Sequence, residues 1–298
     1  MLNRQYGIAL IQILIIVAVM SVLSLYLMQS SRSQLQLAFL AKDRGQAEVE
    51  LESAKNLLLF ELLTKEKVKA LSGYSYEGEE LDEIFISNTW NFYGKPFSIN
   101  EFVTAEIQDQ SGLLNLNVIH IERFSALLVK NGVGLSRANQ IIDSIIDWQD
   151  SNNIPRPSGV EAFNDFRNGP IVELNELDKF IELTGQEKKL IENNTTIYHI
   201  GNFNPMTATI ELIAALSNEF SAQQVEDLRN EGFLTSSMFK QITNIRDQDD
   251  TRFHPSNIVR VKLTAAVGEV SLTKEFVLSL APYVAGTQRP YQYLLSKS

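Results

Sequence analysis

The sequence contains no cysteine, which excludes disulfide bonds, thiol nucleophiles and cysteine-ligated metals. Histidine is scarce, and His120, His199 and His254 lie far apart in the chain. The motifs HExxH, GxSxG and GxxxxGK(S/T) are absent, so the common zinc, serine-hydrolase and P-loop sites lack their residues. We therefore expect a protein that is not an enzyme, because these residues supply neither a nucleophile with its base nor a metal triad.

Positive charge is also in short supply. There are 26 Lys and Arg against 36 Asp and Glu, which gives a formal net charge of −10 over 298 residues. An acidic surface repels phosphate backbones, so we expect no general binding to nucleic acids. Apolar residues, in contrast, make up 44% of the chain, enough for one large or two modest globular units beyond the N-terminal segment.

The N-terminal stretch RQYGIALIQILIIVAVM, residues 4–20, begins a long apolar run. No charged residue occurs in 8–28, and a helix of that length spans a bilayer core of roughly 30 Å. A cleaved signal peptide is the alternative, but its apolar core is shorter and ends in a small-residue site that is missing here. We predict a retained membrane helix, and Arg4 favours a cytoplasmic N-terminus.

The helical pattern continues beyond the membrane segment. No proline occurs between Gln34 and Leu63, and apolar residues recur at spacings of three, four or seven. These apolar residues are Leu40, Ala47, Leu51, Ala54, Leu58 and Leu62. The spacing predicts one long helix whose second half packs on a folded body.

Alternating apolar and polar residues predict strands at about 84–117 and 258–280, the second pair turning at Gly268 and Glu269. The region between them is helical in pattern, and its later helices are expected at 172–183, 206–216, 223–230 and 236–242. The simplest architecture is α+β, with a long N-terminal helix packed on a small antiparallel sheet and a large all-α domain inserted between strands. The tail after Ala285 is expected to be partly disordered.

A short leader that ends in Gly7, followed by this helix and by strands, resembles the type IV pilin and pseudopilin class. The resemblance implies that a membrane prepilin peptidase cuts between Gly7 and Ile8 and methylates Ile8. Gln12 then becomes the fifth mature residue, where most pilins carry a glutamate that compensates the terminal ammonium of a neighbouring subunit. An uncharged residue at this position resembles the K-type minor pseudopilins of type II secretion in particular.

Four further stretches resemble the K-type family, and they occur in the family's order along the chain. They are TWNFYGKPFSINEFVTAEIQDQSGLLNLN (89–117), IIDSIIDWQDSNNIPRPSGVEAFND (141–165), FNPMTATIELIAAL (203–216) and IVRVKLTAAVGEVSLTKEFVLSL (258–280). The organisation expected on this basis is a leader at 1–7, the membrane half of the helix at 8–28, the first part of a pilin-like body at 29–117, an inserted helical domain at 118–255, closing strands at 256–285 and a tail at 286–298.

The resemblance implies a minor pseudopilin at the tip of a short periplasmic filament that initiates assembly and supports export of folded proteins across the outer membrane. The implied partners are I-type and J-type minor pseudopilins, the prepilin peptidase and the inner-membrane assembly platform. The implied location is the inner membrane, with a single span and a periplasmic soluble domain.

The alternative function is a minor pilin of a type IV or competence pilus that binds DNA or another ligand. Its support is KNGVGLSRANQI (130–141), which resembles a helix-hairpin-helix turn whose backbone amides can bind phosphate. Only Lys130 and Arg137 are basic in this stretch, so a purely structural hairpin is favoured.

A cluster of carboxylates is the best candidate for metal binding. Asp143, Asp147 and Asp150 lie at i, i+4 and i+7, so they share a helix face and repel one another unless a cation is present. Calcium takes six to eight oxygen ligands and tolerates irregular loops. The K-type resemblance implies calcium here, with Asp147, Asp150, Asn152 and Glu161 as ligands, although Asn152 stands where the family tends to have aspartate. From the residues alone, a solvated acidic face beside a loop remains the alternative.

Overall fold

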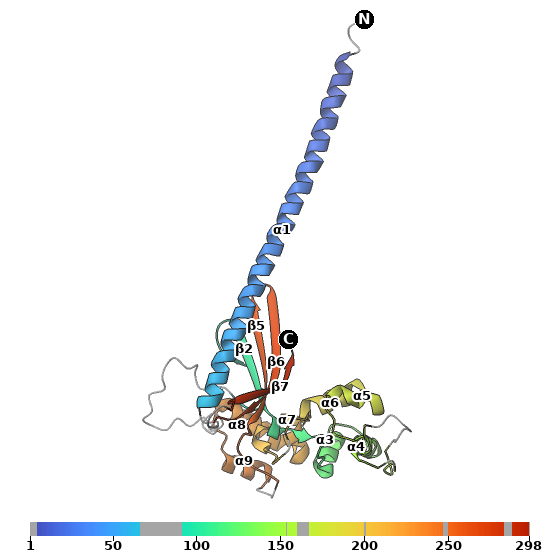
Figure 1. Cartoon of the computed structure of the whole chain (residues 1–298), viewed down its shortest axis with the longest axis vertical. Helices are drawn as coiled ribbons and strands as arrows, with labels where there is room; N and C mark the ends of the chain where they lie inside the picture. The colour runs from blue at the N-terminus through green and yellow to red at the C-terminus, as the bar shows by residue number, and fades with distance from the viewer. Residues whose placement is uncertain are drawn as a thin grey trace, which may run out of the picture.

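The computed structural model describes residues 5–65, 91–152, 154–159, 167–199, 201–246, 250–282 and 288–297, with side chains from Leu10 onward. A single helix, α1 (Gln5–Thr64), projects from a folded body and carries the N-terminus at its far end (Figure 1). Among the described residues, α1 is the one helix long and apolar enough to cross a membrane. Its side chains from Leu10 to Met28 are exposed on every side, as a lipid-facing helix requires.

The second half of α1 packs on a sheet through the predicted stripe. Ala47, Leu51, Ala54, Leu58 and Leu62 are all buried. Leu40, predicted in the same stripe, is 39% exposed, because α1 first meets the body at Asp43. There it touches Gly268, in the turn between β5 (Ile258–Val267) and β6 (Val270–Leu280), where an added Cβ would lie 2.2 Å from the Asp43 carboxylate.

The sheet has the order β1-β2-β5-β6-β7 and is antiparallel throughout. Its strands are β1 (Phe97–Ser98), β2 (Val103–Asp109), β5 (Ile258–Val267), β6 (Val270–Leu280) and β7 (Tyr291–Lys297). β2 pairs with β5 from Val103↔Ala265 to Asp109↔Val259. Strands that are distant in sequence are therefore neighbours, and the predicted α+β class with a helical insertion is confirmed.

Two predictions about this sheet need correction. Of the strand expected from about 84, residues 84–90 lie outside the described residues, and in the segment that follows only the two-residue β1 is formed before β2. The tail expected to be partly disordered contains β7, which pairs with β6 from Glu275↔Lys297 to Leu280↔Tyr291. Edge-to-face ring contacts hold β7 in place, because Tyr293 lies 5.8 Å from Phe276 and 5.6 Å from Tyr291.

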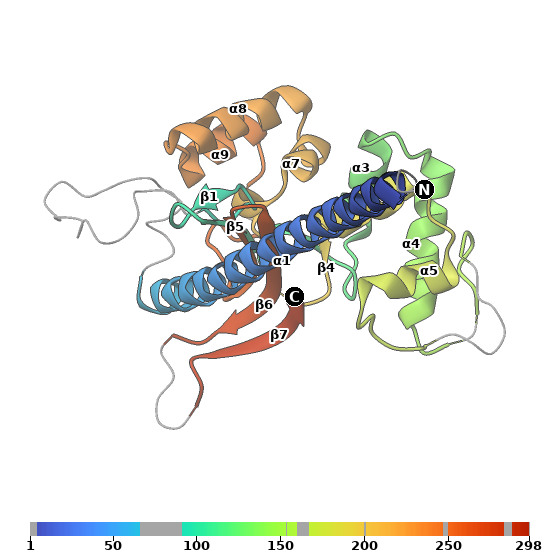
Figure 2. The same cartoon turned by 90° about the horizontal axis from the view of Figure 1, so that it is seen from above.

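The inserted domain consists of short helices around a second apolar core. They are α3 (Ile121–Lys130), α4 (Leu135–Gln149), α5 (Leu177–Phe180), α6 (Gly185–Asn194), α7 (Ile210–Leu216), α8 (Glu219–Glu231) and α9 (Ser236–Thr243), with 3-10 turns η1 (Gln110–Gly112), η2 (Leu174–Glu176) and η3 (Pro205–Thr207) and a small parallel pair of β3 (Leu114–Asn115) and β4 (Thr195–Thr196). Seen from above, α7–α9 lie on one side of the body and α3–α5 on another (Figure 2).

The predicted helices of this region are confirmed in part. α8 and α9 include the predicted 223–230 and 236–242. The helix expected at 172–183 shrinks to η2 and α5, and the one expected at 206–216 is interrupted before Thr209, whose hydroxyl caps α7. Helix α6 was not predicted, although its capping box, formed by Thr184 and Glu187, is a signal that the sequence contains.

Candidate functional site

The residues predicted for processing and assembly all lie on α1. Gly7 and Ile8 fall in its first turns, where the backbone is helical. Gln12 follows on the exposed, apolar part of the helix, between Ile11 and Ile13, whose side chains are each 58% exposed. The structure therefore places the three residues on one continuous helix in the segment suited to lipid or to neighbouring helices.

The predicted acidic cluster is held together by a residue of its own loop. Arg156 bonds through Nε to Asp143 Oδ1 at 2.9 Å, and its backbone N–H lies 3.2 Å from both carboxylate oxygens of Asp147. The backbone N–H of Ser158 donates to Asp143 Oδ2 at 3.1 Å. Asp143 and Asp147 therefore converge on the segment 156–158, and a guanidinium balances one of the two charges.

Asp147 is the most constrained member of this cluster. Its side chain is completely buried, and burial is the main cause that raises its pKa. The negative charges of Asp150 and Asp143 raise the pKa further, whereas the Arg156 backbone N–H lowers it. A bound cation would relieve this repulsion.

The remaining predicted ligands take up loop geometry. Asp150 follows α4 and accepts the Asn152 backbone N–H at 3.2 Å, and Asn152 in turn accepts the Ile154 N–H at 2.8 Å. Glu161 lies outside the described residues. Within the described residues, no three Asp, Glu or His side chains form a group that could hold a metal ion. The oxygen donors have the chemistry that calcium needs, but the described part alone supplies an incomplete set.

The predicted helix-hairpin-helix is a true hairpin of α3 and α4, with Gly134 at the N-cap of α4. Its basic residue Arg137 is engaged inside the domain. Nε and Nη2 bond the two Glu187 oxygens at 2.9 and 3.1 Å. That guanidinium lowers the pKa of Glu187 to about 2. A paired arginine is not available for phosphate, so this geometry favours the structural interpretation of the hairpin.

A site that sequence reasoning missed lies where the inserted domain joins the sheet. Eight polar residues gather at this place, and we call them the junction cluster. They are Gln108, Asp109, Gln110, Ser111, Thr196, Asn204, Thr207 and Ser256.

Asp109 is the centre of the junction cluster and is completely buried. Its Oδ1 accepts the Ser256 hydroxyl at 2.6 Å and the backbone N–H of Ser256 and of Ser111 at 3.1 Å. Its Oδ2 accepts the hydroxyls of Ser111 and Thr207 at 2.5 and 2.9 Å and the Asn204 amide at 3.4 Å. One carboxylate thus ties the end of β2, the start of β5 and η3 together.

Gly112 completes this joint through close contact. A Cβ at Gly112 would lie 2.4 Å from the Thr207 carbonyl oxygen, closer than any side chain can approach. The quoted stretches 89–117 and 203–216 contain Gly112 and Thr207, but the sequence indicated only strands in the first and a helix in the second. The motifs DQSG (109–112) and N-x-x-T (204–207) therefore have a structural role, because they connect the inserted domain to the sheet.

A second contact joins the two units at α8. Arg229 is 7% exposed, stacks over the Tyr93 ring at 4.5 Å and donates through Nη2 to the Met206 carbonyl at 2.7 Å. Burial lowers the pKa of Arg229 to about 10. The Tyr93 hydroxyl donates to the Arg229 carbonyl, and Lys95 bonds Asn230 at 2.6 Å. The loop before β1 therefore docks on the C-terminal end of α8.

The acidic run 247–250 is described only at Asp250. Its carboxylate forms two bonds with the Arg123 guanidinium, at 2.7 and 3.0 Å, and this pairing lowers the Asp250 pKa against the effect of burial. Asp250 therefore attaches the returning chain to α3. Asp247 and Asp249 lie outside the described residues.

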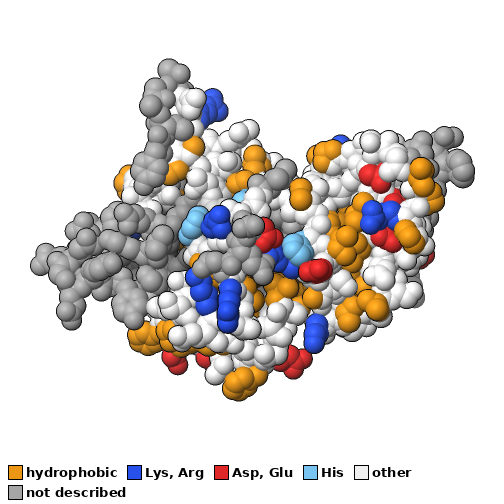
Figure 3. Space-filling model, turned by 90° about the horizontal axis from the view of Figure 1, so that it is seen from below, with side chains coloured by type: hydrophobic (Ala, Val, Ile, Leu, Met, Phe, Trp, Pro, Cys, Tyr) orange, Lys and Arg blue, Asp and Glu red, His pale blue; other side chains and the backbone are white. Residues whose placement is uncertain are grey.

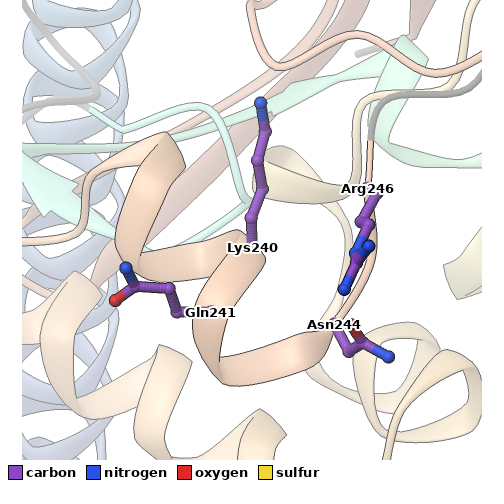
Figure 4. A pocket seen from close by; sticks show the side chains of 4 residues that line it. All are labelled: Lys240, Gln241, Asn244 and Arg246. Atoms are coloured by element: carbon purple, nitrogen blue, oxygen red, sulfur yellow. The ribbon is translucent and has the colours of Figure 1, made fainter.

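A polar hollow of about 560 Å³ is lined by Lys240, Gln241, Asn244 and Arg246, at the end of α9 (Figure 4). In the close-up, Lys240 extends away from Gln241, and Lys240 Nζ lies 4.4 Å from the Phe253 ring centroid. The face away from the α1 N-terminus carries scattered Lys and Arg side chains as well as apolar patches (Figure 3). The described residues that line the hollow carry two cations and two amides.

Comparison with known proteins agrees with the resemblance predicted from the sequence. The chain is 27% identical over 203 residues to the Escherichia coli K12 protein named "Putative type II secretion system protein K". The match covers 66% of this chain and 60% of that protein, less than two thirds of its length. A scan against models of protein families finds no match.

The fold also matches a solved structure. The match is to a chain of the crystal structure of the GspK-GspI-GspJ complex from the type 2 secretion system of enterotoxigenic Escherichia coli. The TM-score is 0.52 at 14% identity, over 86% of this chain and 96% of that chain. This likeness concerns the fold, and with the sequence match it confirms the K-type resemblance.

Proposed function

We propose that this chain, which resembles the K-type minor pseudopilins in sequence and in fold, is a minor pseudopilin of a type II secretion system. The observation that carries the proposal is the combination of an exposed apolar helix that continues into the body with a helical domain inserted between β2 and β5. Such a subunit is anchored by α1 in the inner membrane, with its N-terminus in the cytoplasm and its body in the periplasm. Its role is assembly rather than catalysis.

The proposed position is the tip of the filament. The inserted domain lies at the end of the body opposite the N-terminus of α1 (Figure 1), so a further subunit stacked beyond it would meet this domain rather than a pilin-like body. Gln12 supports the same position, because a subunit with none ahead of it has no neighbouring ammonium to compensate. Immunogold labelling of a tagged chain along isolated filaments tests this point, and label along the shaft contradicts it.

Processing by a prepilin peptidase is part of the proposal. Mass spectrometry of the membrane-extracted protein should find a mature chain that begins at Ile8 and carries one methyl group. Gln12→Glu is the matched assembly test. At the tip, a new carboxylate in an apolar core has no ammonium partner, so we expect fewer filaments and less secretion. Wild-type assembly by this variant contradicts the proposed role of Gln12.

The proposed partners are I-type and J-type minor pseudopilins, and the solved complex named above is a complex of this kind. Deletion of the gene should abolish secretion of the exported proteins, and the full chain should co-purify with both partners from detergent extracts. Co-purification with neither partner, together with normal secretion in the deletion strain, would falsify the proposed function.

Calcium binding remains a further proposal, with Asp147, Asp150, Asn152 and Glu161 as ligands. Its support is the buried Asp147 carboxylate, whose pKa is raised by burial and by its acidic neighbours. Titration calorimetry of the full chain in detergent should detect uptake at up to millimolar calcium, and Asp147→Asn should weaken it. The Asp178→Asn variant, at an exposed pair with Lys188, is the control. Absence of uptake by the wild-type chain contradicts the site.

The alternative, a DNA-binding minor pilin, lacks a specific observation in its favour. Arg137 is paired with Glu187, and Lys130, the other basic residue of the hairpin stretch, forms no ion pair with the residues that the structure describes. An electrophoretic shift with duplex DNA at low salt distinguishes the two functions, since a K-type pseudopilin should give none.

A further inference from the structure

We infer that the outer edge of β7 is an interaction surface that accepts one strand from a neighbouring pseudopilin subunit. β7 closes the sheet on one side and pairs only with β6 among the described strands. Five of its seven residues are exposed. The backbone N–H and C=O groups along its outer side are therefore open to another strand, as in β-strand addition.

The two edges of the sheet differ in a way that fits a single neighbour. At the opposite edge, β1 has two residues, follows Pro96 and lies beside the loop that docks on α8 through Tyr93 and Lys95. An edge of two residues offers too few backbone groups to hold an added strand. Figure 2 shows β7 on the side of the body away from α8 and α9. Among the described residues the sheet thus ends in a two-residue strand at β1 and a seven-residue strand at β7, which limits strand addition to the β7 side.

The composition of β7 indicates the kind of strand that it accepts. Between Tyr291 and Ser296 the strand has no charge and no proline, so it lacks the residues that normally block an edge. The charges that flank this stretch are Arg289 and Lys297, both exposed and both positive. A second copy would bring the same cations to this edge. A strand with acidic or uncharged ends, from a different subunit, is complementary to it.

Leu294 at the middle of β7 sets the register. The pairing with β6 shifts between Val277 and Leu278, so that Leu294 is an extra residue without a partner, and its side chain is 37% exposed. A strand added outside β7 must follow this irregularity and cover Leu294. The edge therefore selects one register and one partner strand, whereas a flat edge would pair with many different strands.

Because β5 and β6 pack alongside the second half of α1 and β7 pairs with β6, an added strand belongs to a subunit that stands beside this one with a parallel long axis (Figure 1). This inference rests on the proposed function, which supplies such subunits. It adds the surface through which a lateral partner binds, and it is independent of the contacts between the apolar halves of the α1 helices.

Hydrogen exchange tests the inference. The full chain in mild detergent is compared alone and mixed with the I-type and J-type minor pseudopilins of the same organism. We expect the amides of 291–297 to exchange at least about tenfold more slowly in the mixture, since the outward N–H groups become bonded. A complex that forms with unchanged exchange in β7 overturns the inference and leaves the proposed function intact. Protection of β7 in the chain alone that rises with its concentration identifies a second copy instead and also overturns it. If no complex forms, the proposed function fails and the inference with it.

A charge placed on the edge provides the second test. Leu294→Lys adds a cation at the centre of β7 without changing the buried core, so the melting temperature should stay close to wild type while the complex becomes about tenfold weaker. The control is Val172→Lys, at a residue 53% exposed on the inserted domain, which should leave binding unchanged. Equal binding by Leu294→Lys and by the wild-type chain contradicts strand addition at this edge.

Discussion

Replacement of Asp109 by alanine is predicted to loosen the attachment of the inserted domain to the sheet. The carboxylate accepts six hydrogen bonds, from Ser111, Ser256, Thr207 and Asn204. The three hydroxyls can rotate, and those of Thr207 and Ser256 have backbone carbonyl oxygens as second acceptors at 3.2 and 3.1 Å. The backbone N–H groups of Ser111 and Ser256 are fixed, and both lose the Asp109 acceptor, at a buried position for Ser111 and at a half-buried one for Ser256.

The magnitude follows from those two amides. A fully buried donor left without an acceptor costs about 1–3 kcal/mol and a half-buried one costs less, so the pair costs about 2–4 kcal/mol. This is a large part of a typical stability of about 5–15 kcal/mol. Asp109→Asn retains an oxygen at the Oδ1 position, where both amides bind, and turns its new NH₂ toward hydroxyls that can accept. We therefore expect that variant to lose only about 1–2 kcal/mol.

Urea unfolding in mild detergent measures both losses. Trp148, buried and stacked on Phe180 at 4.7 Å, reports on the inserted domain once Trp90 is replaced by phenylalanine. Asp178→Ala is the control, because its pair with Lys188 is exposed at the surface and contributes less than about 1 kcal/mol. A loss below about 1 kcal/mol for Asp109→Ala refutes the reasoning. Equal losses for the alanine and asparagine variants show that the two amides are not its source.

Three further variants test separate contacts. Gly112→Ala should lower the free energy of unfolding, measured in urea, by about 2–4 kcal/mol, because its Cβ would lie 2.4 Å from the Thr207 carbonyl oxygen. The control is Gly185→Ala, which has open space around it and should change the stability by less than about 1 kcal/mol. The pKa of Glu187 is about 2 in the folded protein, below the unfolded value of 4.5. Its pair with Arg137 therefore stabilises the fold by roughly 2–3 kcal/mol above about pH 4.5, and this stabilisation is lost as the pH falls toward 2. Glu187→Gln should be less stable at pH 7 and should lose nothing further from this pair in acid; an unchanged acid profile contradicts the pairing. Arg229→Met should cost no more than about 1 kcal/mol. The variant removes a buried cation that has no carboxylate partner among the described residues, and this offsets the lost bond to Met206 and the lost stack on Tyr93. A loss above about 3 kcal/mol contradicts this balance.

The helices and strands whose apolar residues follow a regular spacing were predictable from the sequence. The spacing of Ala47, Leu51 and Leu58 defines the buried face of α1, and alternation defines β5 and β6 on either side of Gly268. β7 does not follow from the sequence pattern, because Gly286 and Pro290 are typical of a disordered tail. The proline lies directly before the strand, at a place where a missing N–H costs little.

The candidate sites were less predictable, since their partners are distant in sequence. Repulsion among the acidic residues of α4 was visible from their spacing, but the pairing of Arg156 with Asp143 depends on how the following loop folds back. Asp109 meets Asn204 and Ser256 across about 95 and 147 positions, and no spacing rule relates residues that far apart. The stretches 89–117 and 203–216 nevertheless contain Asp109 and Asn204, and 141–165 contains Arg156, so the resemblance located these three residues before their role was clear.

The contact between Gly268 and Asp43 sets how far the body stands from the membrane. If the span ends near Met28, then 15 residues of α1 separate it from the first contact with the body, which is about 20 Å of helix. The reach of the β5–β6 hairpin along α1 therefore acts as a spacer. A longer hairpin would bring the folded body down onto the lipid headgroups, and a shorter one would lift it and leave more of α1 to be covered by other chains.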